Sequence, residues 1–248
     1  MKKIIYFIFT LLITYSNIEA QSLVSQQSET RAVVLEEFTG VNCVFCPQGH
    51  EIADAMKAED PDNVIVVNIH AGSFAVPGAG QLDLRTAYGE ALATEMGVTG
   101  YPSGAVNRHS FDGTVALGRG QWEGAANEIK TFDTPVNIGV ESIFDETTRE
   151  LKVKVEVFYT ADSPAPTNFI NVAFLQNGVI GFQSGGSQNY EHNKILREFL
   201  TGQWGDPVTE TTQGSFITRE YSYIVPQAYD IDECNIAAYI SQSRREVF

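Results

Sequence analysis

The sequence predicts an α/β domain followed by an all-β domain, and three observations support this. Short apolar runs alternate with helical patterns over the first half of the 248 residues. After about residue 134 the pattern becomes β-rich, and residues 151–157 alternate strictly between apolar and charged side chains. Finally, Cys43 and Cys46 directly follow the first apolar run, as expected where a strand leads into a helix.

The first domain is expected over residues 31–133, with the order β-α-β-α-β-β-α. Parallel neighbours in a sheet require crossover connections, and the intervening helices supply them. The expected elements are strands at 32–38 and 63–70, a helix after Cys43, a helix over 84–96, a hairpin of 103–108 with 113–117, and a helix over 122–132.

The second domain is expected over residues 134–248 as an immunoglobulin-like sandwich of about 110 residues. Pro, Gly and Ser clusters separate its strands, and the chain stops soon after the last one. This leaves open that the domain continues beyond the last residue given. The expected strands are 151–157, 169–175, 216–225 and 236–240.

The N-terminal residues have the pattern of a secretory signal peptide. Two lysines precede an apolar stretch from Ile4 to Ile13, and Ala20 is a small residue before a cleavage site. The stretch is short for a membrane span, so we expect no transmembrane helix in the mature chain, a retained anchor being the alternative. We assign residues 1–20 to the signal peptide and the Gln/Ser-rich residues 21–30 to a flexible start. The expected location is the periplasm, the outer membrane or the cell surface.

Charge and cysteine content limit the partners and the compartment. The chain has 16 Lys and Arg against 31 Asp and Glu, whereas a nucleic-acid partner would require a basic face. Export places the cysteines in an oxidising compartment, where disulfides persist. Pairing of Cys43 with Cys46 leaves Cys234, which is most simply a buried free thiol, with a link to another chain as the alternative.

The segment Cys43-Val44-Phe45-Cys46 has the arrangement of a redox site. A strand delivers Cys43 to a helix N-terminus, where the helix dipole and free N–H groups stabilise a thiolate, so Cys43 would be the exposed nucleophile. Cys46, one turn later, would resolve a mixed disulfide. A structural disulfide and half of a metal site are the alternatives. Zinc sites usually show a second Cys or His pair, so we expect His50 on the helix surface, and we expect no metal or cofactor.

These features resemble the thioredoxin superfamily, and the resemblance implies further roles. Tyr101-Pro102 falls where that superfamily has a cis-proline opposite the cysteines, so the Tyr101 backbone would pair with a substrate segment. Glu37 falls where thioredoxins have a buried acid that relays the proton of the resolving thiol, and burial would raise its pKa. The alternatives are an ordinary trans turn and a solvent-facing Glu37, since one of Glu36 and Glu37 is expected to face solvent.

Val44 and Phe45 distinguish this segment from the best-known oxidoreductases. The segment has neither the Gly-Pro of thioredoxin nor a His that would stabilise the thiolate. Strong oxidase activity is therefore not expected. Together with the Tyr101 backbone, these two side chains would instead offer an apolar surface to a substrate.

Several segments together resemble the outer-membrane-protein-28-related family of Gram-negative bacteria, over roughly residues 31–248. The resemblance implies a thioredoxin-like domain joined to a β-rich one, and peripheral association with the outer membrane or cell surface. The segments are Leu35–Gly40, His70–Gly72, Gly100–Gly104 with Asn107 and Arg108, and Tyr190–Asn193 with Arg197.

Two functions follow as competing hypotheses. The first is a thiol-disulfide oxidoreductase acting on protein thiols or disulfides of the envelope, in which Cys43 attacks, Cys46 resolves, Pro102 positions the substrate and Glu37 moves a proton. The second is a binding or adhesion protein that uses the fold as a scaffold, with a fixed disulfide. A copper or zinc carrier is a weaker third, and the fold alone does not choose among them.

Overall fold

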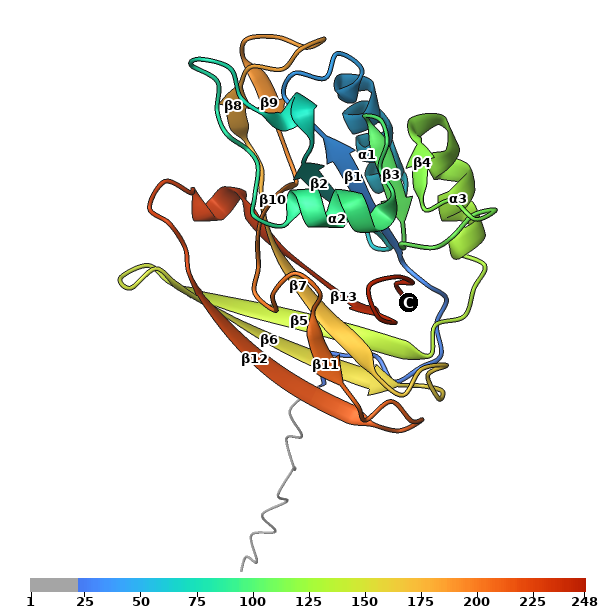
Figure 1. Cartoon of the computed structure of the whole chain (residues 1–248). Helices are drawn as coiled ribbons and strands as arrows, with labels where there is room; N and C mark the ends of the chain where they lie inside the picture. Colours follow the sequence, from blue (N-terminus) through green and yellow to red (C-terminus); the bar gives the residue numbers. More distant parts are fainter. Residues whose placement is uncertain (1–21) are drawn as a thin grey trace, which may run out of the picture.

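The computed structural model describes residues 22–248, and it is rich in β-structure, with mixed sheets and a few helices (Figure 1). The predicted signal peptide lies outside the described residues. Within those residues, no helix is long and apolar enough to cross a membrane. The helices are α1 (Cys46–Glu59), α2 (Gly89–Met96) and α3 (Trp122–Ile129), with short 3-10 helices η1 (Ser73–Ala75), η2 (Arg119–Gln121) and η3 (Ile231–Glu233).

The strands belong to three sheets. Those of the first half are β1 (Val33–Thr39), β2 (Val64–His70), β3 (Ser103–Val106) and β4 (Ala116–Gly118). Those of the second half are β5 (Val136–Asp145), β6 (Glu150–Tyr159), β7 (Asn168–Gln176), β8 (Val179–Gly181), β9 (Tyr190–His192), β10 (Ile195–Phe199), β11 (Asp206–Val208), β12 (Phe216–Ile224) and β13 (Cys234–Ser241).

One mixed sheet of eight strands extends through both halves of the chain. Its order is β11-β7-β10-β2-β1-β3-β4, and β13 also pairs with β7. β1 and β2 are parallel, whereas β3 is antiparallel to β1. β10 joins the halves, because it pairs in parallel with β2 and antiparallel with β7. The two expected domains thus share a sheet, and β10 covers an edge of β2 that would otherwise present unpaired backbone groups.

A second sheet of three strands, β12-β6-β5, lies against the β7 and β13 region of the main sheet (Figure 1). The alternation predicted for residues 151–157 is present in β6, where Leu151, Val153, Val155 and Val157 are all buried. They pack in one core with apolar residues of β7, β11 and β13. The remaining sheet is the short hairpin of β8 and β9.

β1 is buried along its whole length, because packed side chains cover both of its faces. Leu35 packs with apolar residues of α1 and α3, whereas Phe38 packs with residues of α2. The expectation that one of Glu36 and Glu37 faces solvent is therefore wrong, since neither carboxylate is exposed. A strand at the centre of a covered sheet has no wet face.

The helix expected over residues 84–96 begins only at Gly89. Residues 84–88 instead follow a local turn, in which the Asp83 carboxylate accepts from the Arg85 backbone N–H at 3.1 Å. The Thr86 hydroxyl likewise accepts from the Tyr88 N–H at 3.3 Å. Such side-chain bonds to the backbone compete with the helical pattern, which explains the later start.

Candidate functional site

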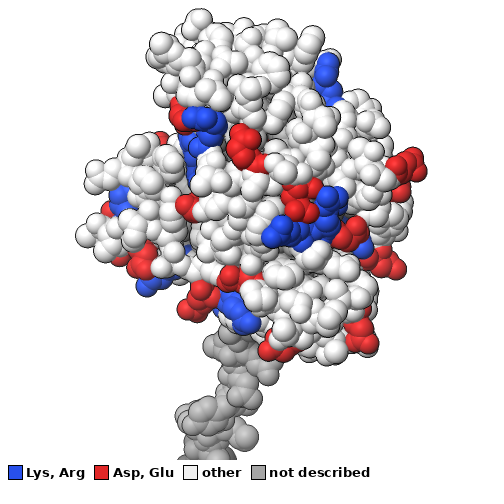
Figure 2. Space-filling model, in the orientation of Figure 1, with Lys and Arg blue, Asp and Glu red and all other residues white. Residues whose placement is uncertain are grey.

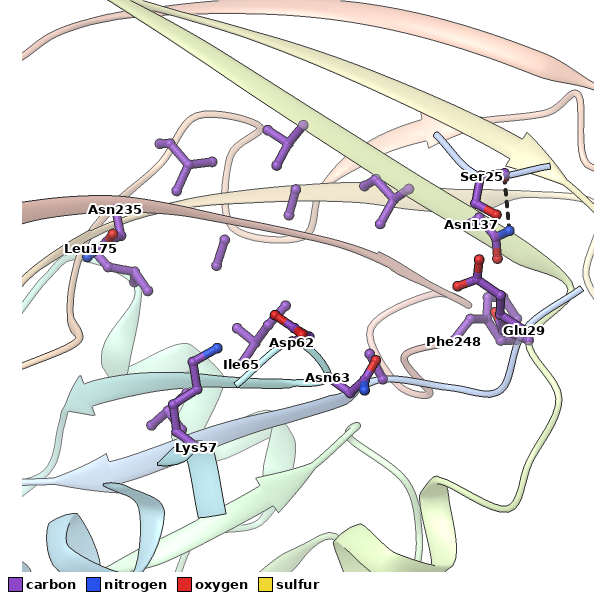
Figure 3. A pocket seen from close by; sticks show the side chains of 18 of the residues that line it. Ser25, Glu29, Lys57, Asp62, Asn63, Ile65, Asn137, Leu175, Asn235 and Phe248 are labelled. Carbon is purple, nitrogen blue, oxygen red and sulfur yellow. Dashed lines mark hydrogen bonds between the residues drawn. The ribbon is translucent and has the colours of Figure 1, made fainter. Parts of the chain in front are cut away.

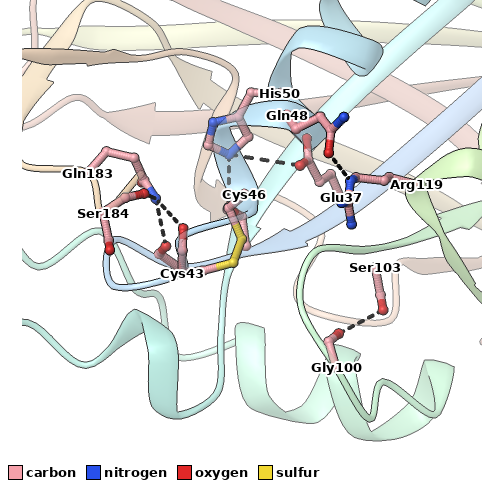
Figure 4. The surroundings of a disulfide bond; sticks show 12 residues. Glu37, Cys43, Cys46, Gln48, His50, Gly100, Ser103, Arg119, Gln183 and Ser184 are labelled. Carbon is pink, nitrogen blue, oxygen red and sulfur yellow. Dashed lines mark hydrogen bonds and ion pairs between the residues drawn. A yellow bond between two sulfur atoms is a disulfide. The ribbon is translucent and has the colours of Figure 1, made fainter. Parts of the chain in front are cut away.

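The two cysteines lie where β1 leads into α1, and they form a disulfide with Cα atoms 5.4 Å apart (Figure 4). α1 begins at Cys46, and Pro47 occupies its first turn, where N–H groups lack intrahelical partners. The Cys46 N–H donates to the backbone oxygen of Cys43 at 3.3 Å, closing the turn. The disulfide predicted from the sequence is thus present at a helix N-terminus.

Cys43 is only 2% exposed, which contradicts the expectation of an exposed first cysteine. Residues 183–187 of the second half, which we name the cover loop, lie against it. The Gln183 side-chain amide donates to the backbone oxygen of Cys43 at 3.0 Å (Figure 4). Gly185 has a φ of +78°, and a Cβ there would lie 2.0 Å from the Val44 carbonyl oxygen, so this approach requires glycine.

Glu37 lies beneath the first turn of α1 and is fully buried. Among residues 22–248, neither of its carboxylate oxygens has a hydrogen-bond partner. Burial raises the pKa of Glu37 well above its usual value, nearby Asp54 raises it further, and Lys194 opposes both. A Cβ on Gly49 would lie 2.5 Å from Glu37 Oε1 and 3.0 Å from the Pro102 ring, so these three residues meet at one point.

The Tyr101-Pro102 peptide bond is cis, and Pro102 is buried. The Ser103 hydroxyl donates to the backbone oxygen of Gly100 at 2.7 Å, which holds this turn closed (Figure 4). β3 follows at once and pairs with β1, placing Gly104 opposite Glu37. The sheet therefore brings the turn and the buried carboxylate together.

His50 is buried, so its expected place on the helix surface is wrong. It lies one turn after Cys46, on the face of α1 directed at the sheet. Its Nε2 lies 2.8 Å from the Thr39 hydroxyl and 3.8 Å from Glu37 Oε1, and its Nδ1 lies 2.8 Å from the Tyr190 hydroxyl. Burial, and then proximity to His192, lower the pKa of His50 to about 4, so the ring is neutral at physiological pH.

Two further histidines lie beside this group. The rings of His70 and His192 are 5.8 Å apart, and that of His192 is 5.0 Å from the Tyr190 ring. Within the described residues, neither ring nitrogen of His70 has a hydrogen-bond partner. Burial lowers the pKa of His70 well below its usual value, and it also lowers that of His192.

The surface around the disulfide is apolar. Val44 is 54% and Phe45 60% exposed, and the guanidinium group of Arg119 lies 5.5 Å from the centre of the Phe45 ring. Figure 2 shows that few charged side chains lie at the end of the molecule that carries β8 and β9. Other exposed apolar residues of this end are Phe74, Val76, Leu82 and Ile180.

Sequence reasoning missed the contributions of Gln183 and Tyr190. They lie 140 residues after Cys43 and His50, respectively. Tyr190 belongs to a segment that supported the family resemblance, but the resemblance assigned no chemical role to that segment. In contrast, Glu37 at the end of β1 and the turn of Gly100 to Ser103 were named from the sequence, and both lie among the surroundings of the disulfide (Figure 4).

A cavity also lies apart from the disulfide. A cavity of about 550 Å³ lies between the first-half strands and β5 and β13, with Lys57 and Asn235 among its lining residues (Figure 3). It contains none of the site residues predicted from the sequence. Among residues 22–248, no group of three or more His, Cys, Asp or Glu side chains is arranged to hold a metal ion.

The family model described as outer membrane protein Omp28 matches residues 89–248, which is more than half of the chain. The chain belongs to this family. The family resemblance found in the sequence is therefore confirmed, and the protein is an exported protein of the cell envelope or surface. No curated protein matches the chain.

Several solved structures are similar to this Omp28-family chain. HBP35 of Porphyromonas gingivalis has a TM-score of 0.68 at 18% identity, covering 89% of this chain and 74% of its own. A protein of Agrobacterium tumefaciens has a TM-score of 0.55 at 14% identity, covering 88% of this chain and 90% of its own. A domain of the outer membrane lipoprotein Omp28 from Porphyromonas gingivalis covers 46% of this chain and 90% of its own, at 18% identity and a TM-score of 0.34. At these sequence identities, the first two similarities show a shared fold and nothing more.

Proposed function

We propose that the protein carries out thiol–disulfide exchange on thiols or disulfides of envelope or surface proteins. In this proposal, residues 31–133 form a thioredoxin-like domain and residues 134–248 an immunoglobulin-like sandwich. One observation carries the proposal. In Figure 4 the surroundings of the disulfide at the N-terminus of α1 include the buried Glu37 carboxylate, which has no hydrogen-bond partner among residues 22–248, and Gly100 and Ser103 of the turn that contains Pro102.

Exchange starts from the disulfide. A substrate thiolate attacks Cys43 Sγ, forming a mixed disulfide and breaking the Cys43–Cys46 bond. The electron pair of that bond leaves on Cys46 Sγ, and the resulting thiolate takes a proton from the Glu37 carboxyl group. A second substrate thiolate then attacks the substrate sulfur of the mixed disulfide and releases Cys43 as a thiolate, which the N-terminus of α1 stabilises.

The net result is one substrate disulfide and a reduced Cys43/Cys46 pair. Of the two protons lost by the substrate thiols, one ends on Cys46 through Glu37 and the other passes to solvent. In reverse, the same steps reduce a substrate disulfide and restore the Cys43–Cys46 bond. Val44, Phe45 and the Tyr101 backbone contact the substrate segment, and Pro102 positions it.

The reduction potential of the Cys43/Cys46 pair, together with trapping of a mixed disulfide, tests the proposal. The Cys46→Ser variant should accumulate a mixed disulfide with a test substrate such as oxidised glutathione, and Cys43→Ser should not. The reduction potential of the pair should lie above about −300 mV, because structural disulfides typically have potentials below that value. A lower potential and no trapped adduct would exclude exchange.

A binding or adhesion protein with a fixed disulfide is the second candidate. The cover loop favours it, because Gln183 holds the backbone of Cys43 and the cysteine is almost fully buried. Under this proposal, the Cys43→Ser/Cys46→Ser double variant keeps full surface binding and loses only stability.

A further inference from the structure

The Glu37 carboxyl group needs a route to solvent. In the exchange steps above it gives up one proton per turnover, and that proton must be replaced before the next. The carboxyl group is fully buried under α1. Direct exchange with bulk water is therefore excluded in the folded, disulfide-bonded state.

His50 is the titratable side chain placed to make this connection. Its Nε2 faces Glu37 Oε1 at 3.8 Å, and its Nδ1, on the opposite side of the ring, lies 2.8 Å from the Tyr190 hydroxyl. A neutral imidazole takes a proton on one nitrogen and releases one from the other, so it can pass a proton across its width.

Tyr190 forms the outer end of this path. Its ring is half-buried on β9, whereas His50 and Glu37 are buried. A phenolic hydroxyl both donates and accepts hydrogen bonds, so it can link the ring nitrogen to solvent. Burial, with Asp54, Glu37 and Glu51 nearby, raises the pKa of Tyr190 to about 12, which keeps the hydroxyl protonated at physiological pH.

We infer that His50 and Tyr190 are positioning residues that form the proton route between the buried Glu37 carboxyl group and solvent. This inference rests on the proposed exchange function. To reload the carboxylate, the Tyr190 hydroxyl takes a proton from water and gives one to His50 Nδ1, while His50 Nε2 gives its proton to Glu37 Oε1. The reverse order unloads it, and rotation of the ring resets the tautomer.

The Thr39 hydroxyl sets the resting position of the ring. It lies 2.8 Å from His50 Nε2, whereas the 3.8 Å to Glu37 is longer than a hydrogen bond. Transfer therefore requires the ring to shift from Thr39 toward the carboxylate. Catalytic hydrogen bonds are commonly long in the resting enzyme and tighten during turnover.

Other charges face this path and influence its pH dependence. Asp54 on α1 faces Glu37, His50 and Tyr190, and Lys194, just before β10, is paired with Asp54 and faces Glu37 and His50. His192 of β9 also faces His50 and disfavours its charged form. Glu51 faces Tyr190, and His70 of β2 also faces His50.

Tyr190→Phe tests the route, because it keeps the ring and removes only the hydroxyl. Steady-state exchange between excess dithiothreitol and excess oxidised glutathione, catalysed by the protein, is followed from pH 5 to pH 9 in water and in deuterium oxide, because reloading of Glu37 is needed only between turnovers. We expect the variant to react about tenfold more slowly near pH 7, with a changed pH profile and a larger solvent isotope effect. Tyr223→Phe, on the distant β12, is the matched control and should behave as the unmodified protein does.

Two measurements separate the route from a structural role. Alkylation of Cys43 by iodoacetamide in the Cys46→Ser background should be equally fast with Tyr190 and with Phe at that position, because this step uses no proton from Glu37. His50→Gln keeps hydrogen-bonding groups but cannot pass a proton, so it should slow steady-state exchange as Tyr190→Phe does.

The outcomes distinguish the two proposals. Exchange by the unmodified protein with an unchanged pH profile in both variants would overturn the route and leave the exchange function intact. Slower Cys43 alkylation in the Tyr190→Phe background would also overturn it, since the variant would then have disturbed the site itself. Failure of the unmodified protein to exchange with any thiol would overturn both.

Discussion

Glu36 and Glu37 are neighbours on β1, and both are fully buried, yet their surroundings differ completely. The Glu36 carboxylate accepts two hydrogen bonds from the Arg108 guanidinium group, at 2.6 and 2.8 Å, and a third from the Tyr239 hydroxyl at 3.1 Å. The Glu37 carboxylate has no hydrogen-bond partner among the described residues and is one of the side chains that surround the disulfide in Figure 4. One face of the strand thus holds a carboxylate paired with Arg108, and the other holds a carboxyl group that has no hydrogen-bond partner among the described residues.

This difference teaches how one strand serves two purposes. A buried charge with a complete set of partners stays ionised and fixes the surrounding structure. A buried acid without partners favours its neutral form, because burial raises its pKa. Sequence adjacency carries no information about this, because successive residues of a strand face opposite layers.

Removal of the Glu36 partner should have the largest effect. Arg108→Met leaves the Glu36 carboxylate buried and unpaired, and we expect the free energy of unfolding to fall by about 3–5 kcal/mol. Urea unfolding at pH 7 measures this change in the free energy of unfolding. The Glu36→Gln/Arg108→Met double variant should recover much of the loss, and a loss below about 1 kcal/mol in the single variant would show that the pair is not needed.

Glu37→Gln should instead stabilise the protein at neutral and alkaline pH. The folded-state pKa of Glu37 is raised, so the unfolded chain loses this proton first as the pH rises. Stability from the neutral acid is complete below about pH 4.5 and declines as pH rises toward the raised folded value. We expect a gain of about 1–3 kcal/mol at pH 8 and almost none at pH 4, measured by urea unfolding at both. An equal gain at both pH values would mean that ionisation is not the cause.

His70→Leu should reduce the loss of stability in acid. Burial lowers the folded-state pKa of His70, so as pH falls below about 6.5 the unfolded chain takes up a proton that the folded protein refuses. The variant should therefore remove up to about 1.4 kcal/mol per pH unit from the slope of unfolding free energy between pH 6 and pH 5. His109→Leu is the control, because His109 lies outside this cluster, beside Glu246.

Gln183→Ala should have the smallest effect on stability and a measurable one on reactivity. It removes the hydrogen bonds that the side-chain amide donates to the backbone oxygens of Cys43 and Gly40, for which we expect a combined loss of about 1 kcal/mol. We expect reduction of the disulfide by dithiothreitol to become several-fold faster, because the cover loop opens more often. Gln213→Ala, at a remote and exposed site, should leave the rate unchanged. No change in the Gln183 variant would indicate that the loop does not limit access.

The sequence alone determined the local features of this protein. Apolar runs and alternation located β1, β2, β6, β7, β12 and β13, because the residues that form a strand lie within a short stretch of chain. The Cys43–Cys46 pair and its position before a helix were also local, as was the family resemblance. These features predicted where the candidate site lies and which chemistry it supports.

The tertiary structure decided what surrounds that site. The short strands β8 to β11 lack a recognisable pattern. β10 pairs with β2 and β7, and the β8–β9 hairpin before it places Tyr190 beside His50 and His192 beside His70. Gln183, between β8 and β9, reaches the backbone oxygen of Cys43. Glu36 and Glu37 are both buried because packed layers cover the two faces of β1. α2 and β13 contribute to the layer on one face, and α1 and α3 contribute to the layer on the other. Contacts between segments so far apart depend on the packing of the whole sheet, and no local pattern encodes them.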